Sequence, residues 1–362
     1  MDPRRIIIQR MHRVGLSGAP FDGIADVVRW LGAVQSQDYG PAKWAIGHRV
    51  RGLRDSEVDR AFAEGIILRT HVLRPTWHFV LPEDIRWLLE LTAPRVHAMN
   101  AYHYRRFELD QVVQKKFSRL IERTLRSEGQ LTRKQIQEIL EKGGIEAKSQ
   151  RLAYIMMHAE LEGLVCSGAL SGNQHTYALL EERAPDARTL SRDQALAELI
   201  RRYFTSHGPA TLNDMKWWSS LAVADIRGGL EMVGAELQNE VIDGLTFWFA
   251  EARRGRKSRS PTVHLLQPYD EYIVGYTESK YLLNLSSVGV PAGQQRSLFN
   301  GVVMLDGQVA GHWKRSLKKD GVIIEVALYA PFAESEMKAL HAQVEAHGKF
   351  LGLKPVVRST LV

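Results

Sequence analysis

The sequence predicts a mainly helical α+β protein in which three tandem winged-helix units precede a small, β-rich α+β domain. Two observations support this fold class. An order of short helices followed by a β-hairpin occurs three times before a basic segment that begins at Arg253, and closely spaced strands follow that segment. We therefore expect four parts, at residues 1–100, 101–188, 189–252 and 253–362.

The first unit carries the signals of three short helices and a hairpin. Apolar residues at three- and four-residue spacing predict a helix over 21–34, and Pro41 suits the first turn of a second helix over 42–50. A third helix and two strands are expected over 56–64, 66–72 and 76–81.

The second unit repeats this order. Thr132 stands before a helical pattern and can cap that helix with its hydroxyl. The expected helices cover 109–127, 133–141 and 150–163, and the expected strands cover 164–167 and 176–180.

The third unit has the strongest turn signal. Asp243-Gly244 separates two strand-like runs, which is typical of a tight hairpin. Thr211 can cap the middle helix. The expected helices cover 194–206, 212–219 and 223–232, and the strands cover 237–242 and 245–250.

The last part begins with five cations in the seven residues 253–259, which indicates a flexible basic connector. Strand-like runs and turn residues then alternate, and a final helix is expected over 334–350. The expected strands cover 263–266, 301–305, 309–314 and 321–328.

Composition excludes several classes of protein. The only cysteine, Cys166, rules out an intrachain disulfide, and no apolar run is long enough for a membrane span or a signal-peptide core. We therefore expect a cytoplasmic, nucleoid-associated monomer with no membrane partner. Neither a metal nor a cofactor is expected, because the histidines show no spacing that pairs them with carboxylates as metal ligands. The histidines considered are His97, His103, His158, His175 and His264.

A net charge of +7 favours polyanionic partners. Candidate contacts to the DNA backbone are Lys43, Arg49, Arg51, Arg253, Arg254, Arg256, Lys257, Lys314, Arg315, Lys318 and Lys319. Runs of basic residues are equally typical of solvated surfaces.

Four segments carry a resemblance to a known family: 34–38 (VQSQD), 74–80 (RPTWHFV), 265–276 (LLQPYDEYIVGY) and 301–313 (GVVMLDGQVAGHW). In these segments the sequence resembles the AlkZ-type, also called YcaQ-type, winged-helix DNA glycosylases. The resemblance implies binding of double-stranded DNA that carries alkylated bases. It also implies base excision repair of bulky N-alkylated purines and the unhooking of interstrand crosslinks.

The family's catalytic motif is a glutamine, an aliphatic residue, and a glutamine or aspartate. Gln35, Ser36 and Gln37 occupy these positions, and Ser36 departs from the pattern. By resemblance, Gln35 and Gln37 hold the attacking water. An alkylated purine is already cationic and leaves readily, so carboxamides suffice as weak bases. Spacing alone favours another role, that of polar loop residues capping neighbouring helices, and the family resemblance reverses this preference.

Four further residues are expected near this motif. Asp38 could act as a base or, as we favour, cap the following helix. Thr76 and His78 alternate along one strand, and His78 could contact the lesion or support the wing from a buried position. Trp77 is a candidate for stacking on DNA.

The sequence supports a monofunctional enzyme. No lysine adjoins the glutamine motif to form a Schiff base, and Lys43 is the nearest one. The alternative function is a non-catalytic winged-helix DNA-binding regulator or structural protein, and RNA as a substrate stays open.

Overall fold

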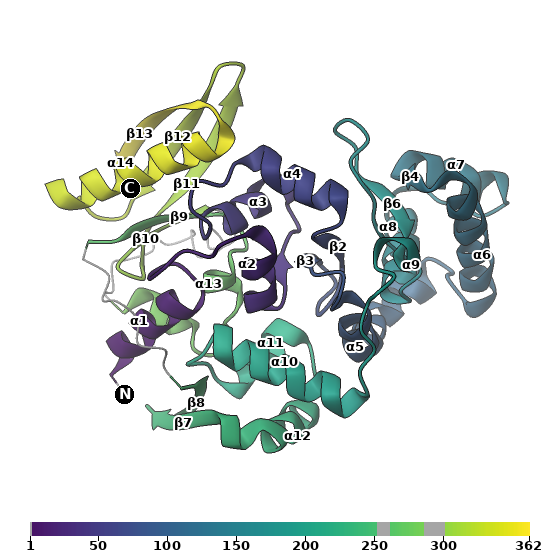
Figure 1. The fold of residues 1–362 in the computed structure, drawn as a ribbon, viewed down its shortest axis with the longest axis horizontal. Helices are drawn as coiled ribbons and strands as arrows, with labels where there is room; N and C mark the ends of the chain where they lie inside the picture. The colour runs from purple at the N-terminus through teal and green to yellow at the C-terminus, as the bar shows by residue number, and fades with distance from the viewer. Residues whose placement is uncertain (1, 252–260, 286–300) are drawn as a thin grey trace. The chain divides into compact units, whose positions relative to one another are not determined.

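The computed structural model describes residues 2–251, 261–285 and 301–362, and it shows a mixed α+β protein that is about half helical, with several small sheets (Figure 1). The chain forms two compact units. Unit 1 comprises residues 1–59, 197–218 and 223–362, and unit 2 comprises residues 60–196 and 219–222. Among the described residues, no helix is both long enough and apolar enough to cross a membrane.

Unit 1 begins with a helix that the sequence analysis did not predict, α1 (Pro3–Arg13). The Asp2 side chain accepts a hydrogen bond from the Arg4 backbone N–H at 3.0 Å, and Pro3 occupies the first turn. Both are ordinary signals of a helix start. The helix buries Ile6, Ile7 and Met11, so the N-terminal segment belongs to the core of unit 1.

The helix expected over 21–34 is shorter than predicted. It forms α2 (Ile24–Leu31) and ends at Gly32, whose φ of +80° favours glycine. The chain then becomes extended in β1 (Val34–Gln35). Two further helices follow, α3 (Tyr39–Gly47) and α4 (Asp55–Glu64), and the boundary between the two units falls within α4.

The sequence between residues 192 and 250 follows the predicted order closely. Thr211 caps the middle helix, since its hydroxyl accepts a hydrogen bond from the Asp214 N–H at 3.1 Å. The elements are α10 (Arg192–Ser206), α11 (Leu212–Ser219), α12 (Val223–Val233), η1 (Gly234–Glu236), β7 (Leu237–Ile242) and β8 (Leu245–Ala250). The last two pair antiparallel, which confirms the predicted hairpin.

The C-terminal part of unit 1 is a five-stranded sheet in the order β13-β12-β11-β10-β9. Its pairs are antiparallel except β12–β13, which is parallel, and β13 was not predicted. The strands are β9 (Val263–Leu266), β10 (Gly301–Leu305), β11 (Gln308–Lys318), β12 (Gly321–Leu328) and β13 (Lys354–Leu361). The short helices α13 (Glu271–Val274) and η2 (Lys280–Asn284) follow β9.

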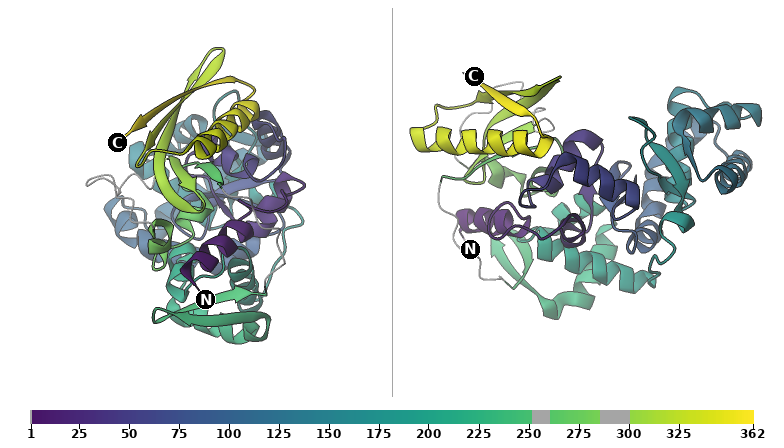
Figure 2. Two further views of the ribbon diagram at one scale, coloured as in Figure 1. Left: turned by 90° about the vertical axis from the view of Figure 1, so that its left-hand side faces the viewer. Right: turned by 45° about the horizontal axis from the view of Figure 1, so that its top comes forward.

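The last helix, α14 (Glu334–Leu351), packs against this sheet, as Figure 2 shows, and against α3. The approach to α3 is close because Gly47 has no side chain. A Cβ at Gly47 would lie 2.4 Å from the Phe350 ring, and Trp44 packs on the same ring at 5.1 Å between centroids. This contact joins α3, which follows the glutamine motif, to the C-terminal sheet domain.

Unit 2 contains a hairpin, a long helix and a second group of helices with strands. The Thr132 hydroxyl caps its helix in a full capping box with Gln135, which confirms the predicted cap. The long helix α5 (Ile85–Arg106) was not predicted; its apolar residues form no clear stripe, and Pro94 interrupts the pattern. The other elements are β2 (Leu68–His71), β3 (Trp77–Val80), α6 (Gln111–Glu128), β4 (Gln130–Thr132), α7 (Arg133–Lys142), α8 (Ser149–Leu161), β5 (Val165–Ser167), β6 (Thr176–Leu179) and α9 (Leu180–Arg183).

Candidate active site

The glutamine motif lies where the chain leaves β1 and enters α3. Gln35 is 5% exposed and Ser36 is fully buried, whereas Gln37 is exposed at a bend. Two glutamines separated by one residue could not share one side of a helix, and the chain here is not helical. The buried Ser36 shows that the middle position of the motif packs inward although it is not aliphatic.

A buried carboxylate holds the backbone of this motif. The Gln35 N–H donates a hydrogen bond to Glu271 Oε1 at 2.9 Å, and the Trp218 indole N–H donates to Oε2 of the same carboxylate at 2.9 Å. His207 Nε2 lies 3.3 Å from that Oε2, and Glu271 is 1% exposed. Glu271 thus fixes the start of the motif, a positioning role that the sequence analysis missed.

Asp270 and Glu271 form the start of α13. Asp270 caps this helix by accepting from the Tyr272 N–H at 3.0 Å, and Glu271 is the first residue of the helix. An aspartate a few residues after the strand-like run 263–266 was the available signal for a helix start.

Arg49 does not lie where a DNA phosphate could reach it. It is 1% exposed, and its guanidinium forms two hydrogen bonds with the Asp270 carboxylate, at 2.8 and 2.9 Å. It also donates to the backbone oxygens of Val14 and Ala45. The prediction of a phosphate contact fails here, because the side chain joins the end of α3 to α13 inside unit 1.

Lys43 likewise has its partners inside the protein. Its ammonium group lies 2.6 Å from Asp55 and 2.8 Å from Asp59, and only 8% of its side chain is exposed. The Tyr39 hydroxyl donates to Asp59 at 2.8 Å. The phosphate contact expected for Lys43 is therefore replaced by a link between α3 and α4.

Arg315 of β11 is a cation close to the motif. Its Nη2 lies 3.4 Å from where a Cβ on Gly40 would stand, in the first turn of α3. Burial lowers the pKa of Arg315, whereas the charges of Asp55 and Asp38 raise it. Asp38 stands at the N-cap position of α3, as predicted, but its side chain forms no capping hydrogen bond. A half-buried guanidinium at the start of a helix adds positive potential beside the exposed Gln37.

The other predicted DNA contacts fall into two groups. Four of the predicted contacts lie in the described part of the chain and are exposed: Arg51, Lys314, Lys318 and Lys319. Lys314 also forms an ion pair with Glu325 at 3.3 Å. The basic connector, with Arg253, Arg254, Arg256 and Lys257, lies outside the described residues.

The three wing residues belong to unit 2. His78 is fully buried, and its Nδ1 lies 3.0 Å from the Thr76 carbonyl oxygen, which favours the supporting role over direct lesion contact. Thr76 is half-buried and precedes β3. Trp77 donates to Glu160 at 3.2 Å and packs against His71 at 4.2 Å between ring centroids. The Arg69 guanidinium lies 4.4 Å from the same indole, so stacking on DNA would compete with these contacts.

One expectation about histidines is wrong. His97 and His158 come together with a carboxylate, that of Glu162, whereas no pairing of these histidines with a carboxylate was expected. His158 and Glu162 are four residues apart, and His97 comes from another helix.

Comparisons with known proteins agree with the family resemblance. A family model described as "DNA glycosylase AlkZ-like" matches residues 28–350. An "Interstrand DNA cross-link repair glycosylase" from Streptomyces sahachiroi is 22% identical over 350 residues, covering 92% of this chain and 91% of the relative. The solved structure of Streptomyces sahachiroi DNA glycosylase AlkZ has a similar fold, with a TM-score of 0.79 at 20% identity, over 99% of this chain and 100% of that one.

Proposed function

Because the chain belongs to the AlkZ-like DNA glycosylase family, we propose that it is a monofunctional glycosylase that hydrolyses the N-glycosidic bond of N7- or N3-alkylated purines in double-stranded DNA. The observation that carries this proposal is the support of the glutamine motif. Glu271 holds the Gln35 backbone from a buried position, while Gln37 is exposed.

The chemistry suits carboxamides. Alkylation at N7 or N3 makes the purine cationic, so the bond from C1′ to the base breaks with its electron pair leaving on a neutral base. The oxygen of water bonds to C1′, and the water gives its proton to solvent. Gln37, aided by Gln35, accepts a hydrogen bond from that water and holds it against the sugar. The good leaving group makes a stronger base unnecessary.

The surroundings of Lys43 support a monofunctional reaction. Strand cleavage at the abasic site would require a free amine to form a Schiff base with the sugar. The Lys43 ammonium is held between Asp55 and Asp59, at 2.6 and 2.8 Å, so the amine is engaged inside the protein. We therefore expect the enzyme to stop at the abasic product.

DNA binding is assigned to the repeated helix-and-hairpin segments and to the exposed cations. We propose that residues 1–100, 101–188 and 189–252 act as three winged-helix modules and that residues 253–362 form the C-terminal domain. One chain would then bind one damaged duplex as a monomer. Among the described side chains, we assign phosphate contacts to Arg51, Lys314, Arg315, Lys318 and Lys319.

The most specific part of the proposal concerns the size of the adduct that the enzyme accepts. The Streptomyces relative is named as an interstrand crosslink repair glycosylase, which supports bulky adducts and crosslinks as substrates here. A panel that runs from N7-methylguanine to an N7-linked interstrand crosslink would rank them by single-turnover excision rate.

The decisive experiment separates an enzyme from a DNA-binding regulator. A duplex with one N7-methylguanine is incubated with pure protein and then heated in alkali, which breaks the strand at abasic sites. We expect breaks with the wild type and with Gln343→Ala, a half-exposed glutamine on α14 that lies outside the segments proposed to bind DNA and serves as the matched control. Gln37→Ala should lower the rate by about 100-fold or more, as for loss of one preorganised polar group.

Equal background cleavage by the wild type and Gln37→Ala would leave the regulator as the function. Strand breaks without alkali would instead contradict the monofunctional assignment.

A further inference from the structure

Unit 2 contains a cluster of metal-ligating side chains that plays no part in the proposed base excision. His97 of α5, His158 of α8 and Glu162, which follows α8, each offer one ligand atom, and these atoms all lie within 4.8 Å of one another. His97 Nε2 is 3.0 Å from Glu162 Oε1, and the two imidazole rings are 5.0 Å apart between centroids.

We propose that His97, His158 and Glu162 bind one divalent transition-metal ion, with Zn²⁺ as the reference ion. Two imidazoles and a carboxylate form a ligand set that zinc accepts, leaving its fourth position open. With the usual bond lengths to nitrogen and oxygen, neighbouring ligand atoms stand roughly 3.3 Å apart around a tetrahedral zinc ion. The 3.0 Å pair is near this value, and the remaining separations have to shorten by at most about 1.5 Å, which side-chain rotation can provide.

The second ring nitrogen of His97 is already held. Its Nδ1 lies 2.8 Å from the Tyr104 hydroxyl, so Nε2 is the nitrogen that faces the cluster. An outer partner of this kind fixes the ring and its tautomer in most histidine metal sites.

His158 provides the observation that points to a ligand. It is 7% exposed, and its Nδ1 has no hydrogen-bond partner among the residues that the structure describes. A buried polar nitrogen without a partner is costly, and a metal ion would satisfy it.

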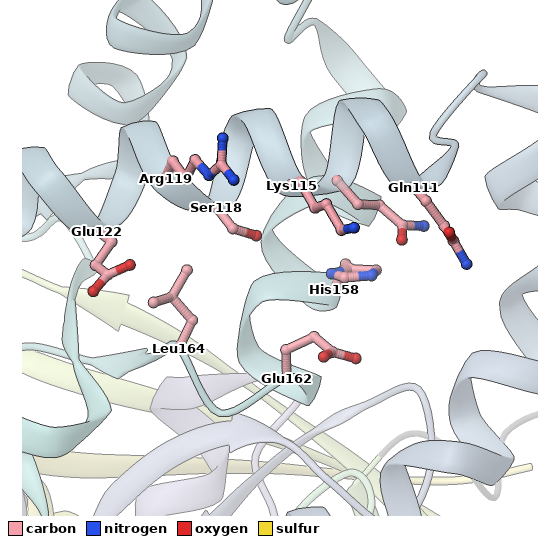
Figure 3. A pocket seen from close by; sticks show the side chains of 9 residues that line it. Gln111, Lys115, Ser118, Arg119, Glu122, His158, Glu162 and Leu164 are labelled. Carbon is pink, nitrogen blue, oxygen red and sulfur yellow. The ribbon is translucent and has the colours of Figure 1, made fainter.

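The cluster opens onto a cavity of about 570 Å³ between α6 and the end of α8. Figure 3 shows His158 and Glu162 facing Lys115 and Ser118 across this space. The charged residues of its wall are Lys115, Arg119, Glu122 and Glu162. Two cations and two anions leave no net positive charge to repel an entering metal ion, and the cavity has room for a water molecule at the open position.

The test is metal binding by the full chain, purified without a polyhistidine tag and stripped with a chelator. Zinc is titrated against a competing chromophoric chelator, and Co²⁺ replaces it for the visible spectrum. We expect one Zn²⁺ per chain, the absorption of tetrahedral Co²⁺, and a rise in Tm on zinc addition. His158→Gln and Glu162→Gln should weaken binding by more than about 100-fold, beyond the usual effect of an outer partner, and Tyr104→Phe by about tenfold.

The matched control is His341→Gln, which removes an exposed histidine on α14 and should leave binding unchanged. The Glu162 side chain is exposed, so Glu162→Gln is expected to fold even if His158→Gln does not. Absence of stoichiometric zinc binding in the wild type, or equal zinc affinity in the wild type and Glu162→Gln, would overturn the proposal. DNA cleavage is not part of the readout, so failure here leaves the glycosylase proposal intact.

Discussion

The backbone N–H of Gln35 donates a 2.9 Å hydrogen bond to the Glu271 carboxylate, 236 residues later in the chain. The same carboxylate accepts from Trp218, so one buried acid connects β1, α11 and α13 within unit 1. This relationship explains how a motif at the end of a two-residue strand can hold a defined conformation.

Replacing Glu271 should slow base excision without removing DNA binding. In Glu271→Gln, an amide N–H₂ has to face donors from Gln35 or Trp218, so the motif shifts. We expect the single-turnover rate to fall by about tenfold to 100-fold, as for small displacements of a reacting geometry. Excision kinetics and duplex affinity are measured on the same preparation, with Glu345→Gln on α14 as the exposed control. A proportional loss of rate and affinity would mean that Glu271 acts only on folding.

The Arg49–Asp270 pair should be a major source of stability in unit 1. Asp270→Ala leaves a buried guanidinium without its carboxylate, which costs about 3–5 kcal/mol of unfolding free energy. Denaturant titration followed by circular dichroism measures this change. Glu236→Gln, which removes a partner of Arg201 at the surface, should have little effect. If the two variants were equally stable, the buried pair would not carry the role assigned to it.

Salt dependence tests the assignment of Arg315. If this guanidinium contacts one phosphate, Arg315→Gln should reduce the slope of log affinity against log salt by about 0.9. Duplex binding is measured by fluorescence anisotropy over a series of salt concentrations. Lys338→Gln, at an exposed position on α14, provides the comparison and should keep the wild-type slope. An unchanged slope in Arg315→Gln would place this arginine outside the DNA contact.

Buried histidines predict a loss of stability in mild acid. Burial and the charge of Arg49 lower the pKa of His264 to about 4, from 6.5 in the unfolded chain. The ring is 2.8 Å from His48, whose pKa burial also lowers well below 6.5. Between pH 6.5 and 4 the unfolded chain binds more protons than the folded one, so stability falls as the pH falls.

His264 alone should contribute about 2 kcal/mol to the loss of unfolding free energy between pH 6.5 and 5. Denaturant titrations at several pH values should show a flatter profile for His264→Gln than for the wild type. His341→Gln should retain the wild-type profile, because this histidine is exposed. A profile that is equally steep in all three proteins would contradict the role of His264.

Local signals in the sequence determined much of the fold. The β7–β8 hairpin has the predicted bounds because Asp243-Gly244 supports a tight turn, with Asp243 at a φ of +50°. Thr132 caps α7 through contacts within three residues. The motif Gln35-Ser36-Gln37 and the family also follow from the sequence, since they depend on residue identity alone.

Tertiary structure decided which side chains of that pattern are available for chemistry. Arg49 and Lys43 are residue types that often bind phosphates, yet both are held by carboxylates inside the protein. Asp270, the partner of Arg49, lies 221 residues away in the sequence, and the partners of Lys43 reach it only because α4 packs against α3. Glu271 and Gln35, and likewise His97 and His158, are also far apart in the sequence and are brought together only by the folded structure. Charges and hydrogen bonds act over a few ångströms in space, and separation along the chain does not reveal which groups the packed core brings within that range.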